Sequence, residues 1–203
     1  MFSSVAGTVK GRIRAAAIAP ALTGGQALQT ILKPNLYHFC VPTTGTGTNN
    51  TIPDGALRVA PWFVPRPIVI SELGLEIITA GNARSVFRIG IYADDGTGYP
   101  GALISDAGTV PADAVGQPKI TGLSISLPAG LFHVGAAQQG GVATIPNVRT
   151  PGAAMLPLGV TSVGSNTSGG AYGATGVNGA LHALFPTAIS VVGALPRIFA
   201  KLV

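Results

Sequence analysis

The stretch VFRIGIYADDGTGYPGALISDAGTV, residues 86–110, decides the fold of this chain. In its first part, Phe87, Ile89 and Ile91 are separated by polar or small residues, which is the two-residue period of a strand with one buried face. An Asp-Gly step and a Tyr-Pro-Gly step follow, and both are typical of a chain reversal. The stretch then continues in extended form, where the Asp-Ala-Gly at 106–108 predicts a β-bulge. We therefore expect two antiparallel strands joined by a turn, with a bulge in the second strand.

Further strand patterns lie on both sides of this hairpin. Upstream, residues 56–64 and 68–79 are largely apolar, and the second segment is expected to form one long strand. The prolines at the end of the first segment favour an edge or crossover position for it. Downstream, residues 123–127 alternate leucine or isoleucine with serine, and residues 131–137 are expected to return beside them as a hairpin partner. The apolar positions of these segments have the same period. We therefore predict one shared core that contains Phe87, Ile89, Ile91, Leu123, Ile125 and Leu127.

The composition favours β-structure throughout the chain. Only 9% of the 203 residues are charged, and 29 glycines and 16 prolines leave little room for long helices. The sequence predicts an all-β fold, an antiparallel and jelly-roll-like β-sandwich, with its core at 26–140. A basic, extended N-terminal arm is expected at 1–25, and a Gly-rich C-terminal extension at 141–203 is expected to complete or extend the sandwich. The polar, low-complexity stretches 42–54 and 164–179 are expected to be loops.

The order of motifs in residues 86–110 resembles a β-sandwich module of minor tail and fibre-like structural proteins of tailed bacteriophages. The likeness extends upstream through ISELGLEIITAG, residues 70–81, and downstream through LSISLPAGLFHVG, residues 123–135. The resemblance implies a virion structural subunit of minor tail or tail-fibre type, forming a homo-oligomer with a trimer as the expected number. Within the same class, a capsid decoration or head-fibre protein is the alternative.

The charges are unevenly distributed along the chain. All seven acidic residues lie between Asp54 and Asp113, so both ends carry only basic groups. Nucleic-acid binding requires clustered cations with stacking aromatic rings, and the basic residues of the ends are too dispersed for it. We expect Lys10, Arg12 and Arg14 to belong to an assembly arm that contacts an acidic protein or an anionic cell envelope, with simple solubility as the alternative. No apolar run is long enough for a transmembrane helix.

Few residues match a catalytic or metal-binding pattern. The sequence lacks a Gly-x-Ser-x-Gly elbow and a His-Glu-x-x-His motif, so we expect no enzyme, no cofactor and no metal site. Asp94, Asp95 and Asp106 are expected to cap turns rather than to bind calcium. Cys40 is the only cysteine, and a buried apolar role is expected for it. His133 is expected to point away from the core face, with its ring solvated or hydrogen-bonded.

Aromatic residues support an alternative of another class, a carbohydrate-binding module. Its stacking faces would be Trp62, Tyr92 and Tyr99, although tryptophan is usually buried and a core role is favoured for Trp62. Glu72 and Glu76 share one face of a strand, but a glycosidase needs its two acids across a cleft, and the sequence marks none.

The expectation from the sequence as a whole is a non-enzymatic structural subunit of a phage virion. Such a subunit is located on the tail or head surface after assembly in the host cytoplasm. Its expected partners are copies of itself, other virion proteins and a host cell-surface glycan, without nucleic-acid binding or membrane insertion.

Overall fold

The computed structural model describes residues 32–41, 47–141, 143–151, 170–186, 190–192 and 194–203. In these ranges the chain forms fourteen strands and no helix. The strands are β1 (Tyr37–Phe39), β2 (Thr48–Thr51), β3 (Leu57–Val64), β4 (Ile68–Gly74), β5 (Ile77–Thr79), β6 (Val86–Asp94), β7 (Pro100–Pro111), β8 (Lys119–Ile120), β9 (Ile125–Leu127), β10 (Gly130–Gln139), β11 (Asn147–Thr150), β12 (Ala171–Ala174), β13 (Ser190–Val192) and β14 (Phe199–Leu202).

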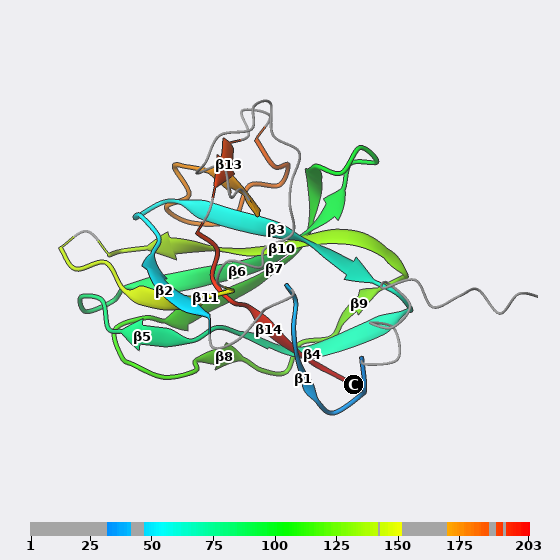
Figure 1. The fold of residues 1–203 in the computed structure, drawn as a ribbon, viewed down its shortest axis with the longest axis horizontal. Coiled ribbons are helices and arrows are strands. Elements are labelled where there is room, and N and C mark those ends of the chain that lie inside the picture. The colour runs from blue at the N-terminus through cyan, green and yellow to red at the C-terminus, as the bar shows by residue number, and fades with distance from the viewer. Residues whose placement is uncertain (1–31, 42–46, 142, 152–169, 187–189, 193) are drawn as a thin grey trace, which may run out of the picture.

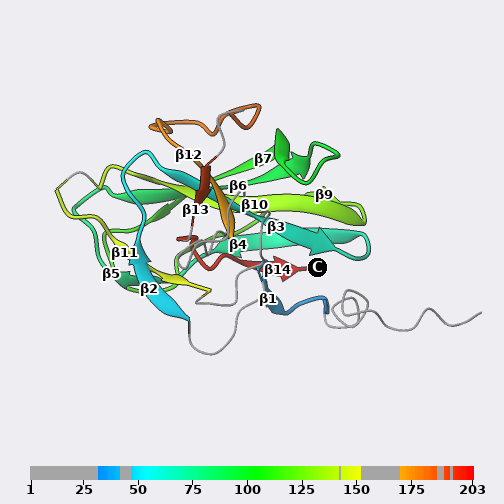
Figure 2. The ribbon, with the colours of Figure 1, turned by 45° about the horizontal axis from the view of Figure 1, so that its top comes forward.

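The strands form three antiparallel sheets (Figure 1). The six-stranded sheet has the order β13-β12-β3-β10-β6-β7, and the five-stranded sheet has the order β1-β14-β4-β8, with β9 also paired to β4. The end sheet, formed by β2, β11 and β5, closes one end of the molecule. Figure 2 shows the two large sheets as layers, with β1 and β14 below β6 and β7. The predicted all-β antiparallel sandwich is confirmed.

The β6–β7 hairpin has the expected form. Its register shifts between Ile89, which faces Gly108, and Gly90, which faces Asp106, so Ala107 is the extra residue of a bulge. Gly108 has a φ of 107°, a conformation that glycine adopts without the strain that a side chain would cause. Both the hairpin and its bulge are therefore confirmed.

The main core lies between the six-stranded and five-stranded sheets, because the inward faces of β6, β10 and β3 meet those of β4, β9 and β14. All six residues of the predicted core take part. Phe87, Ile89, Ile91 and Leu127 are buried in the cluster, and Leu123 and Ile125 pack against its margin. The predicted shared core is confirmed, with the two groups of residues on opposite layers.

The outer face of the six-stranded sheet is covered as well. The segment that follows β12, up to Phe185, covers this face and forms a second apolar cluster with Tyr92, whose ring meets that of Phe185 edge to face at 5.4 Å. The approach is close, since a Cβ on Gly90 would lie 2.2 Å from the Cδ1 of Leu181. A sheet that is buried on both faces needs few charged side chains, which accounts for part of the low charge content.

The position of β3 differs from the expected edge or crossover. This strand lies inside the six-stranded sheet, between β12 and β10. However, β12 pairs only with Leu57–Val59, whereas β10 pairs with the whole of β3. Pro61 therefore lies where β3 has a neighbouring strand on one side only, and a residue without an N–H is tolerated there. The prediction is wrong for the strand, although its physical reason holds locally at Pro61.

Three further expectations also differ from the structure. Residues 68–79 form two strands, because the chain leaves the five-stranded sheet after Gly74 and continues in the end sheet as β5. β10 does not return beside β9, since it pairs with β3 and β6 while β9 pairs with β4. The stretches 42–54 and 164–179, expected to be loops, contain β2 and β12. Segments of small or polar residues lack an apolar period, so only their neighbours β11 and β3 reveal them as strands.

The described residues after 141 are an integral part of the sandwich. β11 lies between β2 and β5, β12 lies beside β3, and β14, the red strand of Figure 1, lies between β1 and β4. The expected N-terminal arm, with Lys10, Arg12 and Arg14, lies outside the described residues. In the described ranges, no helix has the length and apolar character needed to cross a membrane.

Candidate functional site

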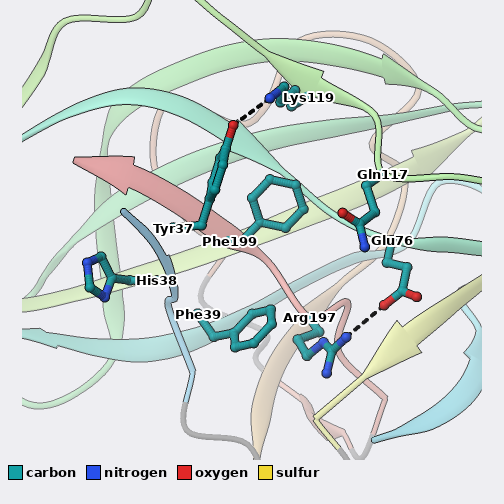
Figure 3. A pocket seen from close by; sticks show the side chains of 8 residues that line it. All are labelled: Tyr37, His38, Phe39, Glu76, Gln117, Lys119, Arg197 and Phe199. Carbon is teal, nitrogen blue, oxygen red and sulfur yellow. Dashed lines mark hydrogen bonds and ion pairs between the residues drawn. The ribbon is translucent and has the colours of Figure 1, made fainter. Parts of the chain in front are cut away.

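A pocket of about 200 Å³ opens on the outer face of the five-stranded sheet, beside β1 and β14 (Figure 3). Its lining combines aromatic rings with charged and amide groups. The lining residues are Tyr37, His38, Phe39, Glu76, Gln117, Lys119, Arg197 and Phe199. We refer to it below as the β1–β14 pocket.

Strand alternation places these side chains on the outer face. In residues 197–202 the even-numbered side chains are buried in the core, so Arg197, Phe199 and Lys201 point the other way. The antiparallel register then sets Tyr37 opposite Lys201 and Phe39 opposite Phe199. The pocket is therefore a direct product of the β1–β14 pairing.

Three rings form the apolar part of the pocket. Tyr37 and Phe199 meet edge to face, with centroids 5.5 Å apart and planes at 89°. The Phe199 ring lies against the backbone of β4, since a Cβ on Gly74 would be 2.5 Å from the ring's Cζ. Tyr37 and Phe39 remain 47% and 48% exposed. Two half-exposed rings thus stand beside a third that is packed on the sheet.

A network around Glu72 fixes Tyr37 in place. The Tyr37 hydroxyl donates to Oε2 of Glu72 at 2.6 Å, and the Nζ atoms of Lys119 and Lys201 lie 3.0 Å from Oε2 and Oε1. The hydrogen bond from Tyr37, followed by those from the two lysines, lowers the pKa of Glu72 to about 2. Hydrogen bonds to Tyr37 and Glu72 also raise the pKa of Lys119. Glu72 is therefore ionised at neutral pH, and its network acts as a scaffold for the Tyr37 ring.

A second network surrounds Glu76 on the other side of the pocket. Arg197 places Nη2 at 2.7 Å from Oε2 of Glu76, and Nε of Arg149 lies 3.4 Å from the same oxygen. The guanidinium of Arg197 also lies over the Phe39 ring, 4.4 Å from its centroid. Asn49 accepts a hydrogen bond from Nη1 of Arg149 at 2.7 Å. Phe39 is therefore held by a cation on one face.

Two polar side chains complete the rim. Within the part of the chain that the structure describes, the Gln117 amide has no hydrogen-bond partner, and Figure 3 shows it between Phe199 and Glu76. Nε2 of His38 is 3.1 Å from the backbone nitrogen of Lys33 and 2.9 Å from its carbonyl oxygen, so the ring is tied to its own loop. Gln117 is thus the neutral group that remains open to a ligand.

This arrangement is suited to binding rather than to acid–base chemistry. A carboxyl group that stays ionised down to about pH 2, as Glu72 does, is a poor general acid at neutral pH. Glu76 is paired with two arginines. Across the described ranges, no cluster of three or more histidine, cysteine, aspartate or glutamate side chains is placed to hold a metal ion.

The aspartates of the β6–β7 hairpin act locally. Oδ1 of Asp95 accepts hydrogen bonds from the backbone N–H and the hydroxyl of Thr97, and Oδ1 of Asp94 accepts one from Gly96. Asp106 forms a two-oxygen contact with Nε of Arg88, at 2.8 and 2.7 Å. These partners are those of turn-capping and ion-paired groups.

The structure does not bring the three predicted stacking residues together at the surface. Trp62 is only 4% exposed and Tyr92 is fully buried, so neither ring offers a face to a sugar, and the core role favoured for Trp62 is observed. Tyr99 is 46% exposed and lies at the hairpin turn, where its ring centroid is 5.3 Å from that of Tyr172.

Cys40 is buried, and burial raises the pKa of its thiol, as expected for an apolar role.

His133 does point away from the main core, but its environment is not solvent. The ring is fully buried under residues 171–185, with Nε2 at 3.1 Å from Oδ2 of Asp94 and the ring centroid 5.7 Å from that of Tyr172. Nδ1 has no partner among the described residues. Burial lowers the pKa of His133, and the hydrogen bond to Asp94 opposes this effect.

Sequence reasoning missed Tyr37, Phe39 and Phe199 as site residues. The available signals were the Tyr-His-Phe alternation at 37–39, the alternation at 197–201 and the shared face of Glu72 and Glu76. None of them shows that two segments so far apart in the chain are adjacent strands.

No protein-family model matches the chain, and no curated protein matches it either.

Proposed function

We propose that the chain is a non-enzymatic structural subunit of a tailed-bacteriophage virion, of minor tail or tail-fibre type. The observation that carries the proposal is the place of the resembling segments in the fold. Residues 70–81, 86–110 and 123–135 contain much of β4 and β10, all of β5, β6 and β9, and nearly all of β7. The likeness therefore covers strands of both layers and of the main core. A capsid decoration or head-fibre protein is the alternative within this class.

The state of the acidic groups supports a non-enzymatic role. Glu76, which lines the β1–β14 pocket, and Glu72, which is hydrogen-bonded to its Tyr37, are each paired with two cations. A hydrolase of sugars would need one of its two acids to carry a proton at working pH. The same networks are well suited to holding the exposed rings in fixed positions.

The surface composition supports a homo-oligomer, with a trimer as the proposed number. Phe63 and Leu184 are 51% and 64% exposed, and few charged residues are available to separate copies. Sedimentation of the isolated chain is expected to show an oligomer. A stable monomer at high concentration would contradict the idea that copies cover this surface.

The location is tested by labelling purified particles with an antibody against this chain and imaging them. A ring at the tail tip or label along a fibre is expected, whereas a lattice over the head would favour the capsid alternative. Particles without the chain would refute both. A chain that lacks residues 1–25 tests the proposed arm with Lys10, Arg12 and Arg14, because it should fold but fail to enter particles.

A second candidate function, carbohydrate binding, is favoured by the β1–β14 pocket. Half-exposed rings held in place by cations are typical of small-molecule sites, in which a few polar groups fix orientation. This candidate is compatible with the first, because a virion subunit that contacts the host surface needs a ligand there. Its stacking residues are Tyr37 and Phe39 rather than Trp62 and Tyr92.

A further inference from the structure

We propose that the β1–β14 pocket binds an acidic saccharide, a sugar ring that carries a carboxylate. The inference deepens the second candidate function and rests on it. The ring is placed against Phe39 and Tyr37, and its anionic group is placed near Lys119 and Arg197.

The apolar side of the argument comes from the exposed rings. Phe39 and Tyr37 lie on the same face of β1 and remain about half exposed. Arg197 holds Phe39, while Lys119 and Lys201 lie 4.9 and 5.7 Å from the centroid of Tyr37. Rings fixed in this way lose little conformational freedom when a ligand covers them, which favours binding.

The charges indicate the sign of the ligand. Four cations, Lys119, Lys201, Arg149 and Arg197, surround only two carboxylates in the two networks. All six groups stay partly exposed, with 12–40% of each side chain accessible. Both networks therefore carry excess positive charge, and an anionic group is attracted whereas a cationic ligand is repelled.

Gln117 and the volume of the pocket restrict the class of ligand further. Gln117 offers both a donor and an acceptor, which matches a ligand with several hydroxyls. The pocket, of about 200 Å³, is smaller than the roughly 300–1,000 Å³ of typical drug-sized sites, so it accommodates one ring of a longer ligand. A free inorganic anion would not use the rings, and a purely apolar ligand would not use the charges. A sugar acid uses both.

The experiment measures binding of uncharged and charged forms of the same sugars. The probes are oligomers of galacturonate, glucuronate and N-acetylneuraminate, each compared with its methyl ester, and binding is followed by calorimetry and by NMR titration. At least one acid is expected to bind, with its neutral ester about tenfold weaker, a loss that corresponds to one ion contact of ~1.4 kcal/mol. Added salt should weaken the acid but not the ester.

Two variants and one matched control locate the site. Phe39→Ala should weaken binding of the acid and of the ester alike by about tenfold, the order of one stacked ring. Lys119→Gln should weaken binding of the acid several-fold more than binding of the ester, because only the acid loses an ion contact. Phe63→Ala removes a ring of similar exposure from β3, on the other sheet, and should change neither. Because all three side chains are exposed, equal melting temperatures are expected and are checked first.

Several results would overturn the proposal. The first is that the folded wild type binds none of the acids. The second is that Phe39→Ala and Phe63→Ala change the affinity equally. The third is that sulfate displaces the acid while Phe39→Ala binds it as the wild type does, which would indicate a simple anion site. Failure of the virion assignment is separate. A chain that is absent from particles but binds a sugar acid keeps the pocket proposal, and a chain that is labelled on particles but binds none keeps only the virion proposal.

Discussion

Gly135→Ala is expected to destabilise the protein strongly, although alanine is usually the better residue inside a strand. Gly135 lies in the middle of β10, opposite Val59 of β3 and Gly90 of β6. A Cβ at this position would lie 2.0 Å from the carbonyl oxygen of Arg58 and 2.6 Å from the Cα of Val59. Both atoms belong to the backbone of β3, so no side-chain rotation relieves the contact.

The size of the effect follows from this geometry. Ordinary close contacts between carbon and a carbonyl oxygen are about 3.3 Å, so β3 would have to move by roughly 1 Å from strands that are normally ~4.8 Å apart. Overpacking costs about 1–3 kcal/mol, and a disrupted ladder bond adds ~1 kcal/mol. Replacing a glycine inside a strand by alanine stabilises the folded state by about 0.5–1 kcal/mol, which offsets part of this loss. The net loss in unfolding free energy is therefore about 2 kcal/mol.

Urea denaturation followed by circular dichroism measures this loss. With a slope of ~2 kcal/mol per molar urea, the midpoint should fall by roughly 1 M. Gly130→Ala is the matched control in the same strand, because its Cβ would meet only the Phe132 ring at 3.6 Å, an ordinary contact. It should be neutral or slightly stabilising. Equal stabilities for the Gly135→Ala variant and wild type would refute the close approach of β3 to β10.

Three other substitutions test the core and the titrating groups. Ile89→Asp places an unpaired charge in the fully buried core and should cost several kcal/mol, roughly 4 or more, so soluble and fully folded protein at neutral pH would contradict the sandwich core. His133→Gln should reduce the pH dependence of stability just below pH 6.5, because the unfolded chain takes up a proton there before the folded one does, and an unchanged slope would argue against a buried ring. Glu72→Gln should reduce the fall in unfolding free energy between about pH 4.5 and pH 2. The stabilisation from ionised Glu72 is complete above about pH 4.5 and is lost as the pH falls to about 2. Acid titrations of unfolding that coincide for variant and wild type would show that the Glu72 network is not formed.

The sequence was informative where a strand is long and buried on one face. The alternation of Phe87, Ile89 and Ile91 and the bulge at Gly108 were predicted from residues alone, because both depend on local periodicity and on the conformational freedom of glycine. The strands at Thr48–Thr51 and Ala171–Ala174 were not predicted, because the first is entirely polar and exposed and the second has only Tyr172 among small residues, so neither shows an apolar period. Their strand state is imposed by neighbouring strands.

The candidate site was predictable only in fragments. Glu72 and Glu76 were expected on one face of a single strand, but Glu72 lies in β4 and Glu76 lies between β4 and β5. The pairing of Tyr37 with Lys201 is a non-local property, because it depends on which strands are neighbours. Nothing within either segment specifies the partner strand. The stacking residues chosen from the sequence were wrong for the same reason. Whether a ring such as Tyr92 is exposed depends on a cover contributed by residues 171–185.

The insertion of β14 between β1 and β4 has a consequence for synthesis of the protein. Glu72 and its partner Lys201 are 129 residues apart in sequence, so the chain must be translated through β14 before the facing edges of β1 and β4 are joined. Until then a nascent chain exposes two unpaired strand edges, a state that invites aggregation and makes folding slow. The same step brings Arg197 and Phe199 to Phe39 and Tyr37. The pocket therefore comes into existence only in a chain that has been translated to β14 and closed, so its presence reports completed folding.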